Sequence, residues 1–245
     1  MSKTIAFVGA KGGTLKSSSV AAVGHLYAAA GLKVTLMDAD PQGTLTRRCG
    51  LRRSPDPLGD DPVLLGLGTD LPATSRLCLL PGGRALEAAD EYKIATHLDR
   101  ARSGNADLVL VDTPPTLGPV VRASLRAADL VVVPSPPGLE ALDGYGDIRA
   151  AAEALGHGVP IRAVVVLAHT RSRILRWTID EFGRAFPGVL YDVIVPIEMA
   201  AAEAGTMRQP VTHYAPRSRS AAAYRALARD MARDLNLGAD IRKEV

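Results

Sequence analysis

Residues 8–18 read Val-Gly-Ala-Lys-Gly-Gly-Thr-Leu-Lys-Ser-Ser and follow a short apolar run at residues 4–8. A standard phosphate-binding loop is written G-x-x-x-x-G-K-[ST], and here Leu15 stands where the glycine before Lys16 is expected. A further lysine, Lys11, lies early in the loop. The stretch therefore indicates a strand-to-helix turn of the phosphate-binding kind, with two departures from the standard pattern.

The residue types in this turn suit a nucleotide. Gly12 and Gly13 let backbone N–H groups approach phosphate oxygens, and the dipole of a following helix favours negative charge. Lys16 would reach the β- and γ-phosphates, and the Ser17 hydroxyl would bind Mg²⁺. The plainer alternative is a glycine turn before a helix whose lysine has no ligand. Carboxylates at other strand ends can decide between the two.

Short apolar runs alternate with Ala-rich helical patterns along the chain. We predict strands at 4–8, 33–37, 77–80, 107–111, 130–133, 161–167 and 189–195, and helices at roughly 17–30, 85–102, 117–127, 139–155, 172–185 and 218–235. Several of the strands are apolar on both faces, as in a buried parallel sheet. The pattern predicts an α/β fold with a doubly wound, mostly parallel sheet flanked by helices. Ligands of such sheets bind at the carboxyl ends of the strands.

Composition limits the domain organisation and the class of partner. A chain of 245 residues, 47% of them hydrophobic, fits one large domain over residues 1–245 better than two small ones. Residues 47–75, rich in Pro, Gly and Arg, break the pattern and are interpreted as an irregular surface excursion, with a partner-binding edge as the alternative. The net charge of +3 does not by itself indicate a nucleic-acid binder, so a basic patch would have to arise by local clustering.

The sequence also suggests a compartment. Cys49 and Cys78 match no C-x-x-C spacing and suit a reducing environment as free thiols. We see no signal peptide and no apolar run of about 18 residues, the length needed to cross a bilayer. We therefore expect a soluble, cytoplasmic protein.

Three aspartates stand at predicted strand ends. Asp112 ends a fully apolar strand, the position from which a carboxylate holds Mg²⁺ through water. Asp38 and Asp40 follow another strand, and strand alternation places them on one side, so one could order an attacking water while the other bonds to backbone. For Asp40 the alternative is a turn-initiating Asp before Pro41.

Several motifs together resemble one family. Lys-Gly-Gly-Thr-Leu-Lys-Ser (11–17), Asp-Ala-Asp-Pro-Gln-Gly (38–43) and Asp-Thr-Pro-Pro-Thr-Leu-Gly (112–118) resemble the deviant Walker A ATPases of the ParA/Soj partition family, relatives of MinD. Further matches are Leu-Glu-Ala-Leu-Asp-Gly (139–144), Val-Pro (195–196), Glu-Ala (203–204) and Tyr-Ala-Pro-Arg-Ser-Arg (214–219). They occur in the family's order over nearly the whole chain. The resemblance implies a deviant P-loop NTPase.

The resemblance also assigns roles. The family writes its loop K-G-G-x-x-K-[ST], so Leu15 occupies a position that is usually Gly but not fixed. Lys11 corresponds to the signature lysine that reaches the partner's phosphate across an ATP-sandwich homodimer. Asp40 would position the hydrolytic water, Asp112 would bind Mg²⁺ indirectly, and Pro196 would lie near the adenine. The implied site is Lys11, Lys16 and Asp40 for catalysis, Gly12, Gly13, Thr14, Leu15, Lys16, Ser17, Ser18 and Pro196 for the nucleotide, and Ser17 and Asp112 for the metal.

The resemblance further implies a switch that binds ATP and Mg²⁺, dimerises, coats nucleoid DNA nonspecifically and hydrolyses ATP slowly until a ParB-type adaptor stimulates it. The cargo would be a plasmid, a chromosomal origin or a protein assembly. Sequence-independent phosphate contacts would come from clustered arginines. The candidates are Arg171, Arg173, Arg208, Arg217 and Arg219, with Arg176 near the first two. Ala200 replaces an arginine often found after the Val-Pro strand end, and a solvated helix face is the plainer interpretation of these arginines.

Two alternatives remain. One is a MinD-like or cargo-positioning ATPase, of which the MinD-like form would dock a C-terminal amphipathic helix on a membrane. However, Asp230 and Asp234 interrupt the apolar stripe of Leu227, Met231 and Leu235, so core packing explains the stripe more simply and no membrane partner is expected. The other alternative is a nucleotide-bound scaffold that does not hydrolyse, because Leu15 restricts the loop.

Overall fold

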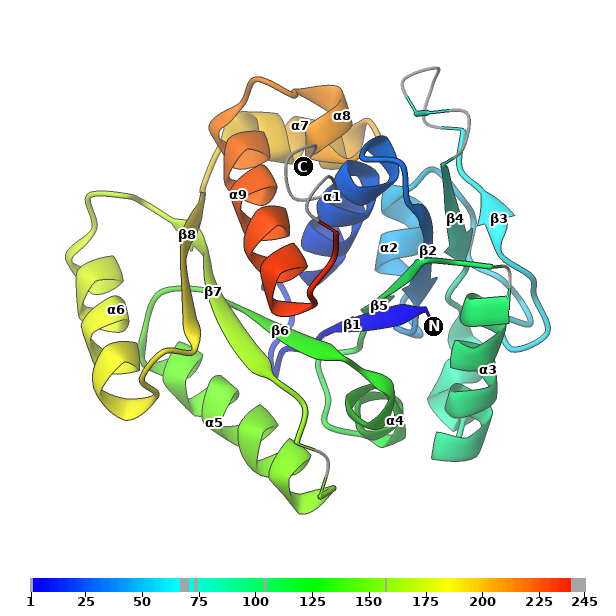
Figure 1. Ribbon diagram of the computed structural model, residues 1–245, viewed down its shortest axis with the longest axis horizontal. Helices are drawn as coiled ribbons and strands as arrows, with labels where there is room; N and C mark the ends of the chain where they lie inside the picture. Colours follow the sequence, from blue (N-terminus) through cyan, green and yellow to red (C-terminus); the bar gives the residue numbers. More distant parts are fainter. Residues whose placement is uncertain (1, 67–70, 73–74, 104, 157, 239–245) are drawn as a thin grey trace.

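The computed structural model describes residues 2–66, 71–72, 75–103, 105–156 and 158–238. Its strands form one sheet in the order β3-β4-β2-β5-β1-β6-β7-β8 (Figure 1). The strands are β1 (Lys3–Phe7), β2 (Lys33–Asp38), β3 (Val63–Leu64), β4 (Arg76–Leu80), β5 (Leu108–Asp112), β6 (Leu130–Ser135), β7 (Ile161–Ala168) and β8 (Leu190–Pro196). All neighbours pair in parallel except β3, which runs antiparallel to β4. The predicted mostly parallel α/β sheet is confirmed.

Helices cover both faces of the sheet. They are α1 (Lys16–Ala29), α2 (Thr44–Arg48), α3 (Glu91–Ser103), α4 (Pro119–Ala127), α5 (Leu139–Ala154), α6 (Arg173–Ala185), α7 (Met199–Thr206), α8 (Val211–Tyr214) and α9 (Arg219–Asp234), with a 3₁₀ turn η1 (Arg84–Ala88). Successive strand side chains point to opposite faces. Phe7 therefore packs in the core beneath α1 and α9, whereas its neighbour Ala6 packs in the core shared with α3, α4 and α5. Figure 1 shows these as two helical layers.

Some elements differ from the prediction. The helix expected at 85–102 divides into η1 and α3, and the Asp90 carboxylate between them accepts the backbone N–H of Lys93 at 2.8 Å, which starts a new helix. The sequence did not predict α2, α7 and α8, which have five, eight and four residues. Helices this short depend on tertiary packing and show little periodicity.

The region interpreted as an excursion begins in the last turn of α2 and contains the short strand β3. Val63 and Leu64 pair with Leu79 and Cys78 at the outer edge of the sheet, and both are exposed. Two parts of this region, residues 67–70 and 73–74, lie outside the described residues.

The apolar stripe of the last helix lies in the core. Leu227, Met231 and Leu235 are buried, and Asp234 accepts hydrogen bonds from Arg162 and from the Tyr191 hydroxyl. The core-packing interpretation of this stripe is therefore confirmed. None of the helices in the described ranges has the length and apolar character needed to span a bilayer.

Strand order brings the suspected site residues to one edge. β1 lies between β5 and β6, and β2 is the next strand beyond β5. In this register Phe7 pairs with Asp112, and Asp112 pairs with Asp38. The loops that follow β1, β2, β5 and β6 therefore leave the sheet side by side.

Candidate functional site

The β1–α1 loop leads into a helix whose first turn is free to bind an anion. Gly13 has φ 77°, where glycine is favoured, and Leu15 also adopts the left-handed conformation, with φ 58° and ψ 18°. Leu15 is the N-cap of α1, and within the described chain no side chain caps this helix. The first turn also carries no acidic residue. Its N–H groups and the positive end of the helix dipole therefore favour a negatively charged ligand.

Lys16 is held beneath this loop. Its side chain is 7% exposed, and Nζ donates to the carbonyl oxygens of Lys11 at 3.0 Å and Gly9 at 3.5 Å. Burial lowers the pKa of Lys16, and the nearby charges of Asp112 and Asp40 oppose that shift. The carbonyls fix the ammonium inside the loop, where the phosphates of a nucleotide would lie.

Asp112 is a buried carboxylate without a hydrogen-bond partner. It is 1% exposed, and neither carboxylate oxygen has a partner among the described residues. Burial raises its pKa well above the usual range, and the Asp38 charge raises it further. The Ser17 hydroxyl and the charge of Lys16 lower it again. Such a group is costly unless a cation or an ordered water satisfies it.

These residues fit a magnesium ion that binds together with a nucleotide. The described residues contain no cluster of three or more His, Cys, Asp or Glu side chains able to hold a metal. Mg²⁺ in nucleotide sites keeps several waters and takes phosphate oxygens together with one or two protein ligands. Ser17 would supply one direct ligand, and Asp112 would hold a bound water.

The other two aspartates bond to backbone. Asp38 is fully buried and accepts both the N–H (2.7 Å) and the hydroxyl (2.6 Å) of Thr46, which fastens α2 to the end of β2. Burial raises the pKa of Asp38 to about 6, against the effect of these hydrogen bonds. Asp40 accepts the N–H of Gln42 at 2.8 Å. Asp40 therefore initiates a turn, and its role with water stays a prediction.

Lys11 faces solvent in the single chain. Its side chain is 57% exposed, and Nζ pairs at 2.6 Å with Glu140, which is itself 74% exposed. The motif at 139–144 had given Glu140 no role. Only the adjacency of β1 and β6 reveals the pairing, because it brings the start of α5 next to the loop.

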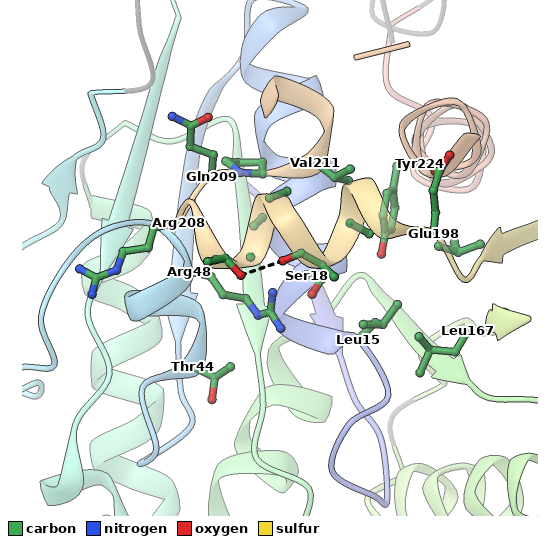
Figure 2. A pocket seen from close by; sticks show the side chains of 18 of the residues that line it. Leu15, Ser18, Thr44, Arg48, Leu167, Glu198, Arg208, Gln209, Val211 and Tyr224 are labelled. Carbon is green, nitrogen blue, oxygen red and sulfur yellow. Dashed lines mark hydrogen bonds between the residues drawn. The ribbon is translucent and has the colours of Figure 1, made fainter. Parts of the chain in front are cut away.

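A cavity of about 680 Å³ continues from the loop along α1. Leu15 and Ser18 line one side of it (Figure 2). Pro196, at the end of β8, also lines it. The side of α2 and the segment from α7 to α8 close it. Pro196 lines the same cavity as the loop, and its place near an adenine stays a prediction. Thr14 is buried in the loop, with its hydroxyl 3.4 Å from the Lys11 carbonyl. Sequence reasoning had not placed Arg48 at this cavity.

The candidate DNA-binding arginines fall into two groups. Arg171 and Arg173 lie at the start of α6, which packs in the core of α3, α4 and α5. Arg208, Arg217 and Arg219 come from the α7–α9 segment, which covers the other face of the sheet. Arg208 lines the cavity, and the Arg219 guanidinium lies 3.6 Å from Glu198.

An uncapped helix start, a buried lysine and an unsatisfied aspartate at the carboxyl edge of a parallel sheet define a nucleotide-binding P-loop protein. The chain belongs to the CobQ/CobB/MinD/ParA nucleotide-binding domain family, whose model matches residues 5–243. This confirms the resemblance to ParA/Soj-type partition ATPases of the MinD/ParA superfamily.

Individual relatives agree with this assignment. The chain is 32% identical to the chromosome-partitioning ATPase Soj of Thermus thermophilus, over 94% of this chain and 95% of the relative. It is 29% identical to the sporulation initiation inhibitor protein Soj of Bacillus subtilis, over 95% and 99%. The septum site-determining protein MinD of Pyrococcus horikoshii, solved with Mg-ADP, superposes with a TM-score of 0.76 at 21% identity, over 94% and 96%. The expected adenine nucleotide and Mg²⁺ agree with that complex, and the family supports an ATPase activity in general.

Proposed function

We propose that this chain is an ATP-dependent dimerising switch that binds double-stranded DNA nonspecifically and drives plasmid or chromosome partition with a ParB-type adaptor. The supporting observation is the unsatisfied buried carboxylate of Asp112, next to Lys16 and Ser17 at the uncapped start of α1. Mg²⁺ and ATP would satisfy all three groups at once. The core of α1, β8 and α9 supports treating residues 1–245 as one domain, acting in the cytoplasm on the nucleoid.

Each residue has a defined task in this proposal. Lys16 binds the β- and γ-phosphates, while Ser17 and Asp112 hold Mg²⁺, Asp112 through water. Asp40 orients the hydrolytic water. Lys11 leaves Glu140 and reaches the phosphate bound by the second copy, where its ammonium balances charge that develops on the transferred group. Hydrolysis is slow because the water and Lys11 are in place only in the dimer.

The arginines account for the proposed DNA contact. Arg171 and Arg217 are exposed, as are Arg173, Arg208 and Arg219. A dimer doubles each group, and its phosphate contacts add along one duplex. Because such contacts release counterions, DNA binding with ATP should weaken steeply as salt increases.

The proposal is tested by sedimentation of wild type and Asp40→Ala with ATP, ADP and DNA. We expect Asp40→Ala to lose hydrolysis by about 100-fold or more, because the water is no longer oriented. With ATP it should accumulate as a DNA-bound dimer, and with ADP it should remain monomeric and free. An Asp40→Ala protein that is monomeric with ATP, or that binds DNA equally with ADP, would contradict the switch.

A second candidate, the non-hydrolysing scaffold, is favoured by the left-handed backbone of Leu15. Leucine in this conformation costs about 1–2 kcal/mol, and its side chain projects into the cavity. We expect Leu15→Gly to keep nucleotide affinity within about threefold, since glycine adopts the same backbone, and to increase the rate of phosphate release severalfold.

Leu15→Ala is the matched control, because it removes the bulk and keeps the strained backbone. If the rate of phosphate release increases in Leu15→Ala as well as in Leu15→Gly, the slow rate of wild type is caused by the bulk of the leucine side chain. Release that is undetectable in wild type, with and without DNA, would favour the scaffold over the ATPase, and release that a substitution then restores would assign the block to Leu15.

A further inference from the structure

Arg48 is a half-buried cation at the cavity, and none of the described residues pairs with it. It lies at the end of α2 and lines the cavity together with Ser18 of α1 (Figure 2). In the described part of the chain its guanidinium makes no ion pair and no hydrogen bond. Of the described residues that line the cavity, only Glu198 carries a carboxylate, and that group accepts the backbone N–H groups of Ser220 (2.8 Å) and Arg219 (3.3 Å). The charge of Arg48 therefore lacks a nearby counter-charge.

Helix α7 leaves space for this guanidinium. A Cβ on Gly205 would lie 2.6 Å from Nη1 of Arg48. Gly205 sits inside α7 and has no positive φ, so its backbone does not require glycine. The absence of a side chain at position 205 instead lets Arg48 lie against the helix.

Arg48 also lies close to the first turns of α1. Burial raises the pKa of Tyr224 to about 12, while a hydrogen bond with Ser19 and the charge of Arg48 lower it. The two hydroxyls are 3.1 Å apart. The guanidinium thus acts on a tyrosine that is bonded directly to α1.

Positive charge accumulates at this end of the cavity, where Asp112 and Asp40 attract Lys16 but no ion pair among the described residues involves Arg48. The start of α1 carries the positive end of the helix dipole, has no acidic residue in its first turn and holds the buried Lys16. A half-buried guanidinium added to these groups is unfavourable unless an anion binds. Arg48 is therefore a group whose partner arrives with the ligand.

The part of the nucleotide that Arg48 would contact follows from which loop residues line the cavity. Lys16 and Ser17 serve the β- and γ-phosphates and Mg²⁺, and neither lines the cavity. Ser18 does line it, and the base end lies at Pro196. The group between them is the α-phosphate, which the backbone of such loops also contacts. We infer that Arg48 binds the α-phosphate of the nucleotide and so anchors ADP and ATP alike. This inference rests on the proposed nucleotide site.

The test is calorimetric binding of Mg-ADP and of adenosine to wild type and Arg48→Gln. A hydrogen bond to a charged group contributes about 1.5–3 kcal/mol, so we expect Arg48→Gln to weaken ADP binding about 10- to 100-fold. Adenosine, which lacks phosphate, should bind within about twofold of wild type, and Arg48→Lys should restore part of the ADP affinity. Arg52→Gln removes an equal charge from an exposed position outside the cavity and should change neither affinity.

Gly205→Ala provides an independent variant, because its Cβ would displace the guanidinium while Arg48 stays in the chain. We expect it to weaken ADP binding in wild type and to have no further effect in the Arg48→Gln background, since residues that share one contact are not additive. ADP affinity unchanged by Arg48→Gln, or an equal loss for adenosine, overturns the inference while leaving the nucleotide site intact. A folded wild type that binds no Mg-ADP overturns the proposed function as well.

Discussion

Asp112→Asn is expected to make the nucleotide-free protein more stable and to reduce Mg²⁺-dependent ATP hydrolysis by about 100-fold. Both effects have one cause. The buried carboxylate has no hydrogen-bond partner among the described residues, and the attraction of Lys16 and Ser17 offsets only part of the cost of burying its charge until Mg²⁺ binds. Replacing the carboxylate with an amide removes a free-energy cost to folding of about 1 kcal/mol or more. It also removes the group that holds the metal-bound water.

The gain in stability should depend on pH. Burial raises the pKa of Asp112 in the folded chain, whereas in the unfolded chain the carboxyl ionises near pH 4. Between these two values the folded state binds more protons, so this group lowers the stability of wild type as the pH increases. The free energy of unfolding of Asp112→Asn should therefore exceed that of wild type only slightly at pH 4. The excess should grow towards neutral pH, as measured by urea unfolding.

Asp38→Asn is the matched control, since Asp38 pairs with Asp112 in register and is equally buried. Its oxygens accept the N–H and hydroxyl of Thr46, so its amide variant should be less stable than wild type at neutral pH. If Asp112→Asn also loses stability, the Asp112 carboxylate has a partner in solution and is not reserved for the metal.

The contrast between these aspartates shows what the sequence predicts well. The seven predicted strands all form, because apolar runs flanked by turn residues report burial on both faces of a parallel sheet. The position of Asp112 at a strand end followed from the same pattern. That Asp38 is satisfied and Asp112 is not depends on Thr46 of α2, a helix of five residues with no periodicity to detect.

The same reasoning explains what the sequence left out of the site. Glu140 and Arg48 approach the loop only through strand order and helix packing, and neither has a spacing that marks it. Leu15 was correctly singled out as a departure from the loop pattern. Its left-handed backbone shows that leucine keeps the conformation usually reserved for glycine, so the departure changes the side chain and not the path of the loop.

The second large effect is expected from Lys11→Ala. In the proposed dimer each Lys11 contacts the phosphate held by the other copy, as arginine fingers do in related chemistry, where removing one costs about 10³-fold or more in rate. ATP-dependent dimerisation should disappear in sedimentation, and hydrolysis should fall by a similar factor. Affinity for Mg-ADP should stay within about threefold of wild type, because the Lys11 ammonium is exposed and does not take part in the chain's own loop.

Glu140→Gln should act in the opposite direction and weakly. Lys11 has to leave Glu140 before it can reach a second copy, so removing the carboxylate frees the ammonium and favours the dimer. An ion pair between two such exposed side chains contributes at most about 1 kcal/mol, and dimerisation breaks one in each copy, which limits the gain in dimer affinity to about 30-fold. Lys11→Ala should weaken the dimer, whereas Glu140→Gln should strengthen it. If the ion pair only stabilised its own loop, both substitutions would act in the same direction. A Lys11→Ala protein that still dimerises with ATP would show that the nucleotide does not bridge the two copies through this residue.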